Sequence, residues 1–72
     1  MANCENTIMQ EIENKQCGRL DIAKLYWLAL RCNDDIDWRR INSAILERWS
    51  YSALEWIKRQ AWSGKCFSEK EQ

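Results

Sequence analysis

The sequence predicts an all-α fold, a compact bundle of three to four helices. Proline is absent and only two glycines occur among the 72 residues, so few positions interrupt a helix. Apolar residues recur at spacings of three and four through most of the chain. The apolar fraction of 46%, which includes five tryptophans, favours a folded domain over a disordered tail.

The length predicts a single helical domain over residues 1–72, with mobile ends over about 1–5 and 65–72. One core of this size rarely supplies more than about 3–5 kcal/mol, so a disulfide, a metal or self-association would help the chain to fold. No apolar run is long enough to span a membrane, and the N-terminus does not resemble a signal peptide. We therefore expect an intracellular, cytoplasmic location without membrane contact.

The first two helices are expected over about residues 6–16 and 20–32. The first carries only a narrow apolar stripe, built on Ile8 and Ile12, and is expected to be the weakest helix. The second is apolar almost all round, which predicts a buried central helix. Its inward arc comprises Ile22, Leu25, Tyr26, Leu28, Ala29 and Cys32.

The last two helices are expected over about residues 36–49 and 53–62, joined by a tight turn. Asp35 or Asp37 is expected to cap the third helix. Ser52 and Glu55 form a capping-box pattern before the fourth helix, and Gly64 is placed to end it. The core stripes are Trp38, Ile41, Ile45 and Trp49 in the third helix, and Leu54, Ile57 and Ala61 in the fourth. The pair resembles a helix-turn-helix in outline, although its turn lacks the glycine often found there.

Composition argues against an enzyme. Histidine is absent, which removes the commonest general base and metal ligand and every Ser-His or Cys-His pair. No glycine-rich phosphate loop occurs, and the carboxylates fall at helix caps and on polar faces. We expect no catalytic residue, no cofactor, no metal and no small-molecule substrate.

The four cysteines are Cys4, Cys17, Cys32 and Cys66. They lack the close pairing that is typical of zinc sites. If the first two helices form an antiparallel hairpin, Cys4 and Cys32 fall at the same end. Cys17 and Cys32 would lie about 20 Å apart along the second helix, which is too far for a disulfide. For an intracellular chain we expect free thiols, with Cys32 as a small core residue.

The tryptophans divide into core and candidate surface residues. Trp38 and Trp49 lie in the apolar stripe of the third helix and are expected in the core. Trp56 lies about 140° from the inward direction of the fourth helix, and Trp62 about 100°. Exposed indoles grouped on one face are typical of protein interfaces, although another helix or the tail could cover them.

Basic residues gather in the second half of the chain. The formal charge is zero overall, but residues 36–66 hold six basic and three acidic side chains. Basic side chains that alternate with aromatic ones can hold phosphates and stack on bases, although charges on solvent faces are usually just solvated. The possible nucleic-acid contacts are Arg39, Arg40, Arg48, Lys58, Arg59 and Lys65.

Two functions follow as hypotheses. The favoured one is a non-enzymatic module that recognises a protein partner or a second copy of itself, as an adaptor, inhibitor or regulatory subunit. Trp56 and Trp62 would be its anchors, and Lys58 and Arg59 a polar rim. The alternative is a nucleic-acid-binding module that uses the basic face of residues 36–66.

Overall fold

The computed structural model describes residues 4–32 and 35–64, and this part of the chain forms four helices. They are α1 (Cys4–Glu13), α2 (Arg19–Leu30), α3 (Trp38–Arg48) and α4 (Tyr51–Ser63). The predicted all-α bundle is therefore confirmed. Helix α1 begins at Cys4, so residues 4 and 5 are helical. The other end predicted to be mobile, 65–72, lies outside the described residues.

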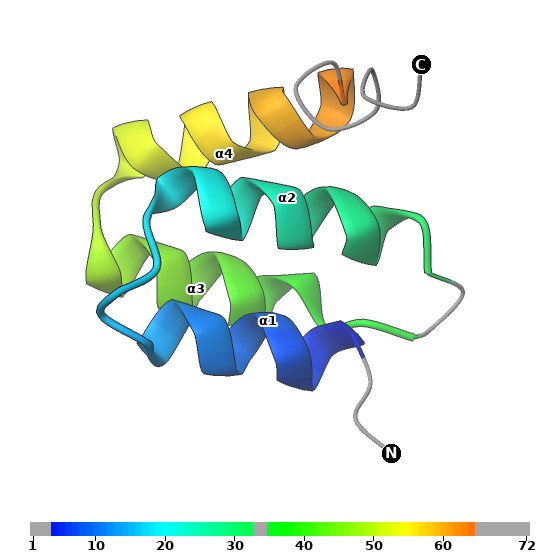
Figure 1. Cartoon of the computed structure of the whole chain (residues 1–72), viewed down its shortest axis with the longest axis horizontal. Coiled ribbons are helices and arrows are strands. Elements are labelled where there is room, and N and C mark those ends of the chain that lie inside the picture. Colours follow the sequence, from blue (N-terminus) through cyan, green and yellow to red (C-terminus); the bar gives the residue numbers. More distant parts are fainter. Residues whose placement is uncertain (1–3, 33–34, 65–72) are drawn as a thin grey trace.

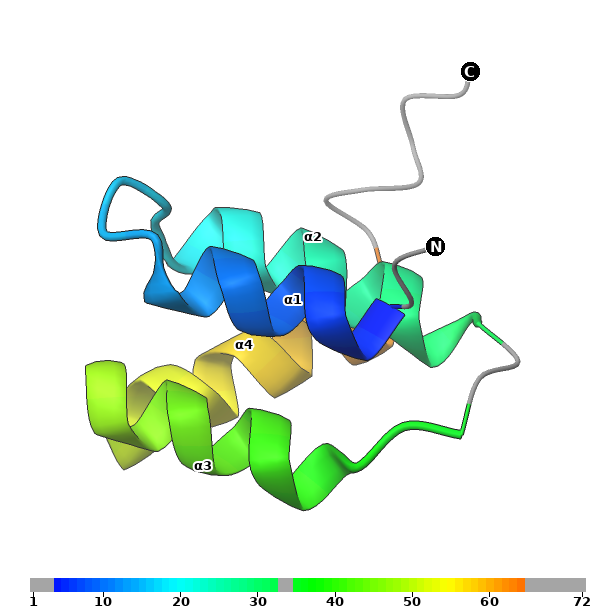
Figure 2. The same ribbon diagram turned by 90° about the horizontal axis from the view of Figure 1, so that it is seen from below.

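The helices form two layers, one made by α1 and α2 and the other by α3 and α4 (Figure 1, Figure 2). Successive helices reverse direction, so α2 and α4 run the same way and pack against each other more extensively than any other pair. Helix α1 packs against both α2 and α3. The first halves of α2 and α4 thus lie close together, and so do their second halves.

Every helix contributes to a core between the two layers. Its largest fully buried side chains are five isoleucines: Ile8, Ile22, Ile41, Ile45 and Ile57. The other buried hydrophobic residues complete it: Ile12, Ala23, Tyr26, Ala29, Ala53, Leu54 and Ala61. The inward positions predicted for Ile8, Ile12, Ile22, Tyr26, Ala29, Ile41, Ile45, Leu54, Ile57 and Ala61 are all confirmed.

Helix α2 makes the most extensive contacts in the bundle, but its neighbours do not enclose it. Leu28, predicted to be in the core, is 42% exposed, and Leu20 is 54% exposed. The reason is geometric: in a two-layer bundle α1 and α4 cover two sides of α2, and its outer side stays open to water. Leu25 is intermediate and packs against the edge of the core.

Side chains cap the third and fourth helices. Asp37 caps α3 as predicted, where its Oδ1 accepts a hydrogen bond from the backbone N–H of Arg40 (3.4 Å). Helix α4 is capped by Ser50, whose Oγ accepts from the N–H of Ala53 (3.3 Å). The cap predicted at Ser52 is therefore wrong by two residues. The linker between α3 and α4 shrinks to two residues, 49 and 50.

Gly64 ends α4 in the left-handed region (φ 66°), as its position predicted. Its backbone lies directly against the indole of Trp27 on α2. A Cβ atom at this position would come within 2.8 Å of Trp27 Nε1. Glycine is therefore required here both by the backbone angle and by the packing of α4 on α2.

A disulfide joins Cys4, at the start of α1, to Cys32, just after α2. The prediction of free thiols is wrong for these two residues. The antiparallel α1–α2 hairpin places them at the same end, which is the geometry that permits a bond. Cys17, at the opposite end of the hairpin, keeps its thiol, and its Sγ donates a hydrogen bond to Glu11 Oε1 (2.7 Å). Cys66 lies outside the described residues.

Candidate functional site

The side of α4 that faces away from the core carries exposed aromatic and charged side chains. Tyr51 and Trp62 are 66% and 69% exposed. They are eleven residues apart, which is close to three helical turns, so both project from the same side of α4. Three charged residues lie between them on this side. We call the set the α4 outer face: Tyr51, Glu55, Lys58, Arg59 and Trp62.

This face follows from the periodicity of α4. Positions 53, 54, 57 and 61 are apolar and buried, so the positions between them point outward. Glu55 and Lys58 are both partly exposed, and Lys58 Nζ lies 3.7 Å from Glu55 Oε2. Tyr51 also interacts with Glu55, and its hydrogen bond to that carboxylate raises the pKa of the Tyr51 phenol. The carboxylate of Glu55 therefore interacts with both Tyr51 and Lys58.

Two hollows flank the centre of the α4 outer face, and both are lined by Glu55 and Arg59. The first, of about 600 Å³, lies beside Trp62. The second, of about 460 Å³, lies beside Tyr51 and is closed on one side by Arg19 of α2. A closed cavity of about 150 Å³ already holds a benzene ring, so either hollow has room for an aromatic side chain. The face therefore offers a protruding aromatic ring and a concave site at each end.

Trp56 is less exposed than predicted. It is only partly exposed and packs against the edge of the core. The guanidinium of Arg19 lies 5.1 Å from the centroid of its ring, a cation–π distance. The first turn of α2 covers Trp56 in this way because α2 and α4 run side by side. Of the two predicted anchors, Trp62 is the one that is fully available.

Arg48, predicted as a nucleic-acid contact, is instead occupied inside the protein. Its Nη1 donates to the backbone oxygens of Glu11 (3.4 Å), Ile12 (2.7 Å) and Asn14 (2.9 Å). Its Nη2 donates to those of Lys15 (3.2 Å) and Cys17 (2.6 Å). Carbonyl groups at the end of a helix lack partners within the helix, and Arg48 supplies them for α1. The guanidinium also lies 4.3 Å from the ring centroid of Trp49.

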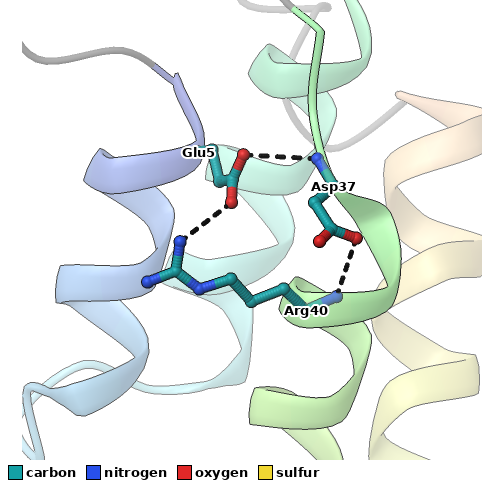
Figure 3. A network of polar contacts seen from close by, with 3 residues as sticks. All are labelled: Glu5, Asp37 and Arg40. Atoms are coloured by element: carbon teal, nitrogen blue, oxygen red, sulfur yellow. Dashed lines mark hydrogen bonds and ion pairs between the residues drawn. The ribbon is translucent and has the colours of Figure 1, made fainter.

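The side chain of Arg40 also makes a contact within the protein (Figure 3). Its Nη1 lies 3.0 Å from Glu5 Oε2, although the Arg40 side chain remains 56% exposed. Glu5 Oε1 accepts a second bond, from the backbone N–H of Asp37 (3.2 Å). The start of α1 is thereby joined to the start of α3. Arg39 is exposed, and Lys65 lies outside the described residues.

The structure thus divides the predicted basic set. Lys58 and Arg59 adjoin Trp62 on the α4 outer face. Arg39 and Arg40 lie in the first turn of α3, and Arg48 points toward α1. A continuous basic surface formed by all of these residues is therefore not what the fold produces.

The remaining tryptophans support the bundle. Trp38 and Trp49 are partly buried and pack against the core, as predicted. The ring of Trp38 lies 4.7 Å from that of Tyr26, centroid to centroid, and the hydroxyl of Tyr26 donates to Asn42 Oδ1 (2.9 Å). These contacts connect α2 to α3 across the core.

Sequence reasoning missed Tyr51 as a surface residue because it placed Tyr51 in the turn. The signal was present, since Tyr51 precedes Trp62 by three turns of helix. Recognising it required knowing that Ser50, and not Ser52, caps α4.

Within residues 4–32 and 35–64, no group of three or more His, Cys, Asp or Glu side chains is placed to hold a metal ion. No helix in this part of the chain is long and apolar enough to cross a membrane. No protein family, curated protein or solved structure gives a significant match to this chain. The α4 outer face is therefore judged on its own chemistry.

Proposed function

We propose that this protein is a non-enzymatic binding module that recognises another protein through the α4 outer face. The observation that carries this proposal is Trp62, which is 69% exposed and adjoins Lys58 and Arg59. A large indole in water is costly, and interface centres are rich in Trp, Tyr and Arg. Tyr51, at the other end of the same face, adds a second exposed aromatic ring.

The residues of the face would have different roles. Trp62 and Tyr51 would fill pockets on the partner and supply most of the binding energy. Lys58, Arg59 and Glu55 would form a polar rim that selects and orients the partner. Trp56, which Arg19 partly covers, would lie at the margin of the contact and contribute less.

The proposal is tested with Trp62→Ala. This substitution should leave the melting temperature nearly unchanged, because surface substitutions usually stay within about 0.5 kcal/mol. Immobilised wild-type protein should retain partner proteins from a cell extract that the Trp62→Ala protein loses. Leu28→Ala is the matched control, since Leu28 is an exposed apolar residue on another helix.

Two further variants distinguish a residue that anchors the partner from a residue that supports the core. Trp49→Ala should unfold the domain, because Trp49 packs against the core. Trp56→Ala should destabilise it less than Trp49→Ala and weaken binding less than Trp62→Ala. If Trp62→Ala melted as early as Trp49→Ala, Trp62 would be a structural residue and the proposal would fail.

Nucleic acid remains the alternative partner, through Lys58 and Arg59 beside Trp62. The salt dependence of the affinity distinguishes a nucleic-acid partner from a protein partner. Release of counterions from phosphates gives a steep loss of affinity as salt rises, whereas an apolar protein contact depends weakly on salt. Binding of labelled single-stranded DNA or RNA, measured between about 50 and 200 mM salt, would reveal the steep loss if this alternative holds.

The Cys4–Cys32 disulfide bears on the cellular compartment in which the protein works. The expected free thiols rested on the expected cytoplasmic location, because disulfides are rare in the cytosol. A cytoplasmic role therefore requires that this bond resist the glutathione pool, which corresponds to a reduction potential below about −300 mV. Titration in glutathione buffers measures this potential, and a higher value would favour an oxidising compartment.

A further inference from the structure

The α4 outer face is complementary to itself. Tyr51 and Trp62 lie at its two ends, and Glu55 and Lys58 lie between them at equal distances from the point midway between positions 56 and 57. A two-fold axis that lies between two copies of α4, perpendicular to both and level with this point, places position 51 of one copy opposite position 62 of the other and position 55 opposite position 58. Two copies of α4, packed antiparallel, would therefore place each aromatic residue opposite the other kind and each acid opposite a base.

The geometry points to a second copy of this chain as the partner of the α4 outer face, in an antiparallel α4–α4 dimer. This inference rests on the proposed function and names its partner. In a two-fold symmetric contact the same patch serves both subunits, so the patch must complement itself. The charge order along α4 meets this requirement at positions 55 and 58, because Glu55 of one copy faces Lys58 of the other.

The hollows fit the same arrangement. In the antiparallel pair, Trp62 of one copy points toward the hollow beside Tyr51 of the other, which Arg19 and Trp56 also line. Tyr51 of the first copy points toward the hollow beside Trp62 of the second. Arg19 would then lie near an incoming indole, a contact that a guanidinium favours. Each protruding ring thus has a concave site opposite it.

The small size of the α4 outer face predicts a weak dimer. Helix α4 has 13 residues and is about 20 Å long, so the contact falls near the lower limit of about 1,000 Å² for specific interfaces. Contacts at this lower limit are typically weak or transient, so we expect a dissociation constant in the micromolar range. Trp62→Ala should weaken the dimer at least about tenfold, because truncation of an anchoring Trp commonly has that effect.

Charge reversal provides a sharp test. Glu55→Lys makes the face entirely basic, and Lys58→Glu combined with Arg59→Glu makes it entirely acidic. Each variant alone should remain monomeric in sedimentation equilibrium at concentrations where the wild type dimerises. An equimolar mixture of the two should form a heterodimer, because the basic side chains at positions 55 and 58 of one chain then face acidic side chains at positions 58 and 55 of the other. Circular dichroism checks that both variants stay helical.

The outcomes distinguish this inference from the proposed function. A wild type that stays monomeric up to about 1 mM, or a mixture that forms no heterodimer, overturns the second copy as partner. If the monomeric wild type still captures a protein in a Trp62-dependent manner, the proposed function stands with a different partner. If neither dimerisation nor Trp62-dependent capture occurs, both fail.

Discussion

Arg48 connects the end of α3 to the end of α1 through five backbone oxygens. Arg48→Ala would remove the side-chain donor of five carbonyl groups, of which those of Glu11, Ile12 and Cys17 are partly buried. We expect a loss of about 2–4 kcal/mol of unfolding free energy, because bonds from charged donors are strong and unpaired buried acceptors are costly. Urea denaturation followed by circular dichroism measures the loss. Arg48→Lys should recover little of it, since lysine lacks the planar fork.

Arg39→Ala is the control for Arg48. Arg39 lies on the exposed side of α3, where substitutions usually change stability by less than about 0.5 kcal/mol. Equal unfolding midpoints for the two alanine variants would show that Arg48 does not hold α1 in place.

The phenol of Tyr26 is expected to make the free energy of unfolding depend on pH in the alkaline range. Burial raises the pKa of its phenol, and the hydrogen bond to Asn42 opposes this shift. The folded chain therefore holds the phenolic proton more tightly than the unfolded chain, whose tyrosines titrate near pH 10. The resulting stability is complete below about pH 10 and is lost as pH rises through the raised pKa. Unfolding free energies measured between about pH 8 and 11 should fall, and Tyr26→Phe should make the fall shallower.

Tyr26→Phe should also cost about 1 kcal/mol at neutral pH, through the lost bond to Asn42. Tyr51→Phe serves as the comparison, since Tyr51 is 66% exposed and solvent screens its contact with Glu55. If both variants changed the alkaline slope equally, burial of Tyr26 would not be the cause.

At the scale of the element, the end of α4 depends on Gly64. Gly64→Ala should destabilise the fold by more than about 1 kcal/mol, because alanine disfavours positive φ and its Cβ would clash with Trp27. Gly18→Ala is the matched variant. Gly18 is the N-cap of α2, with φ −95° and open space around its Cα, so alanine there is unstrained and should cost less than Gly64→Ala. Thermal melts of the two variants give the comparison, which fails if Gly64→Ala melts no earlier than Gly18→Ala.

At the scale of the whole molecule, α1 is fixed at both ends by contacts outside its own apolar stripe. The Cys4–Cys32 disulfide and the Glu5–Arg40 ion pair hold its start. Arg48 holds its end. The helix with the narrowest stripe is thus retained by one covalent bond and by side chains of α3.

Reduction of the Cys4–Cys32 disulfide tests the largest of these contributions to stability. The disulfide closes a loop with a sequence separation of 28, which is expected to contribute about 3–4 kcal/mol. A core of this size supplies a similar amount, so reduction with dithiothreitol should lower the melting temperature strongly. The Cys4→Ser, Cys32→Ser double variant should melt at the reduced temperature with or without reductant. A wild type that melted equally in both conditions would show that the bond does not stabilise the fold.

The sequence by itself determined the helical class, the inward stripes of isoleucine and alanine, the cap at Asp37 and the stop at Gly64. These follow from periodicity and backbone chemistry, which act over a few residues. It also indicated that Trp62 faces away from the core, because that depends only on the geometry of α4.

Only the tertiary structure decided the rest, because those outcomes depend on which helices become neighbours. The parallel packing of α2 and α4 covers Trp56 with Arg19 and leaves Leu28 exposed. The antiparallel α1–α2 hairpin brings Cys4 to Cys32. The approach of α3 to α1 turns Arg48 from a surface charge into a cap. Contacts between residues about 30 positions apart cannot be read from local spacing, because loop geometry and packing choose among several pairings of the same stripes.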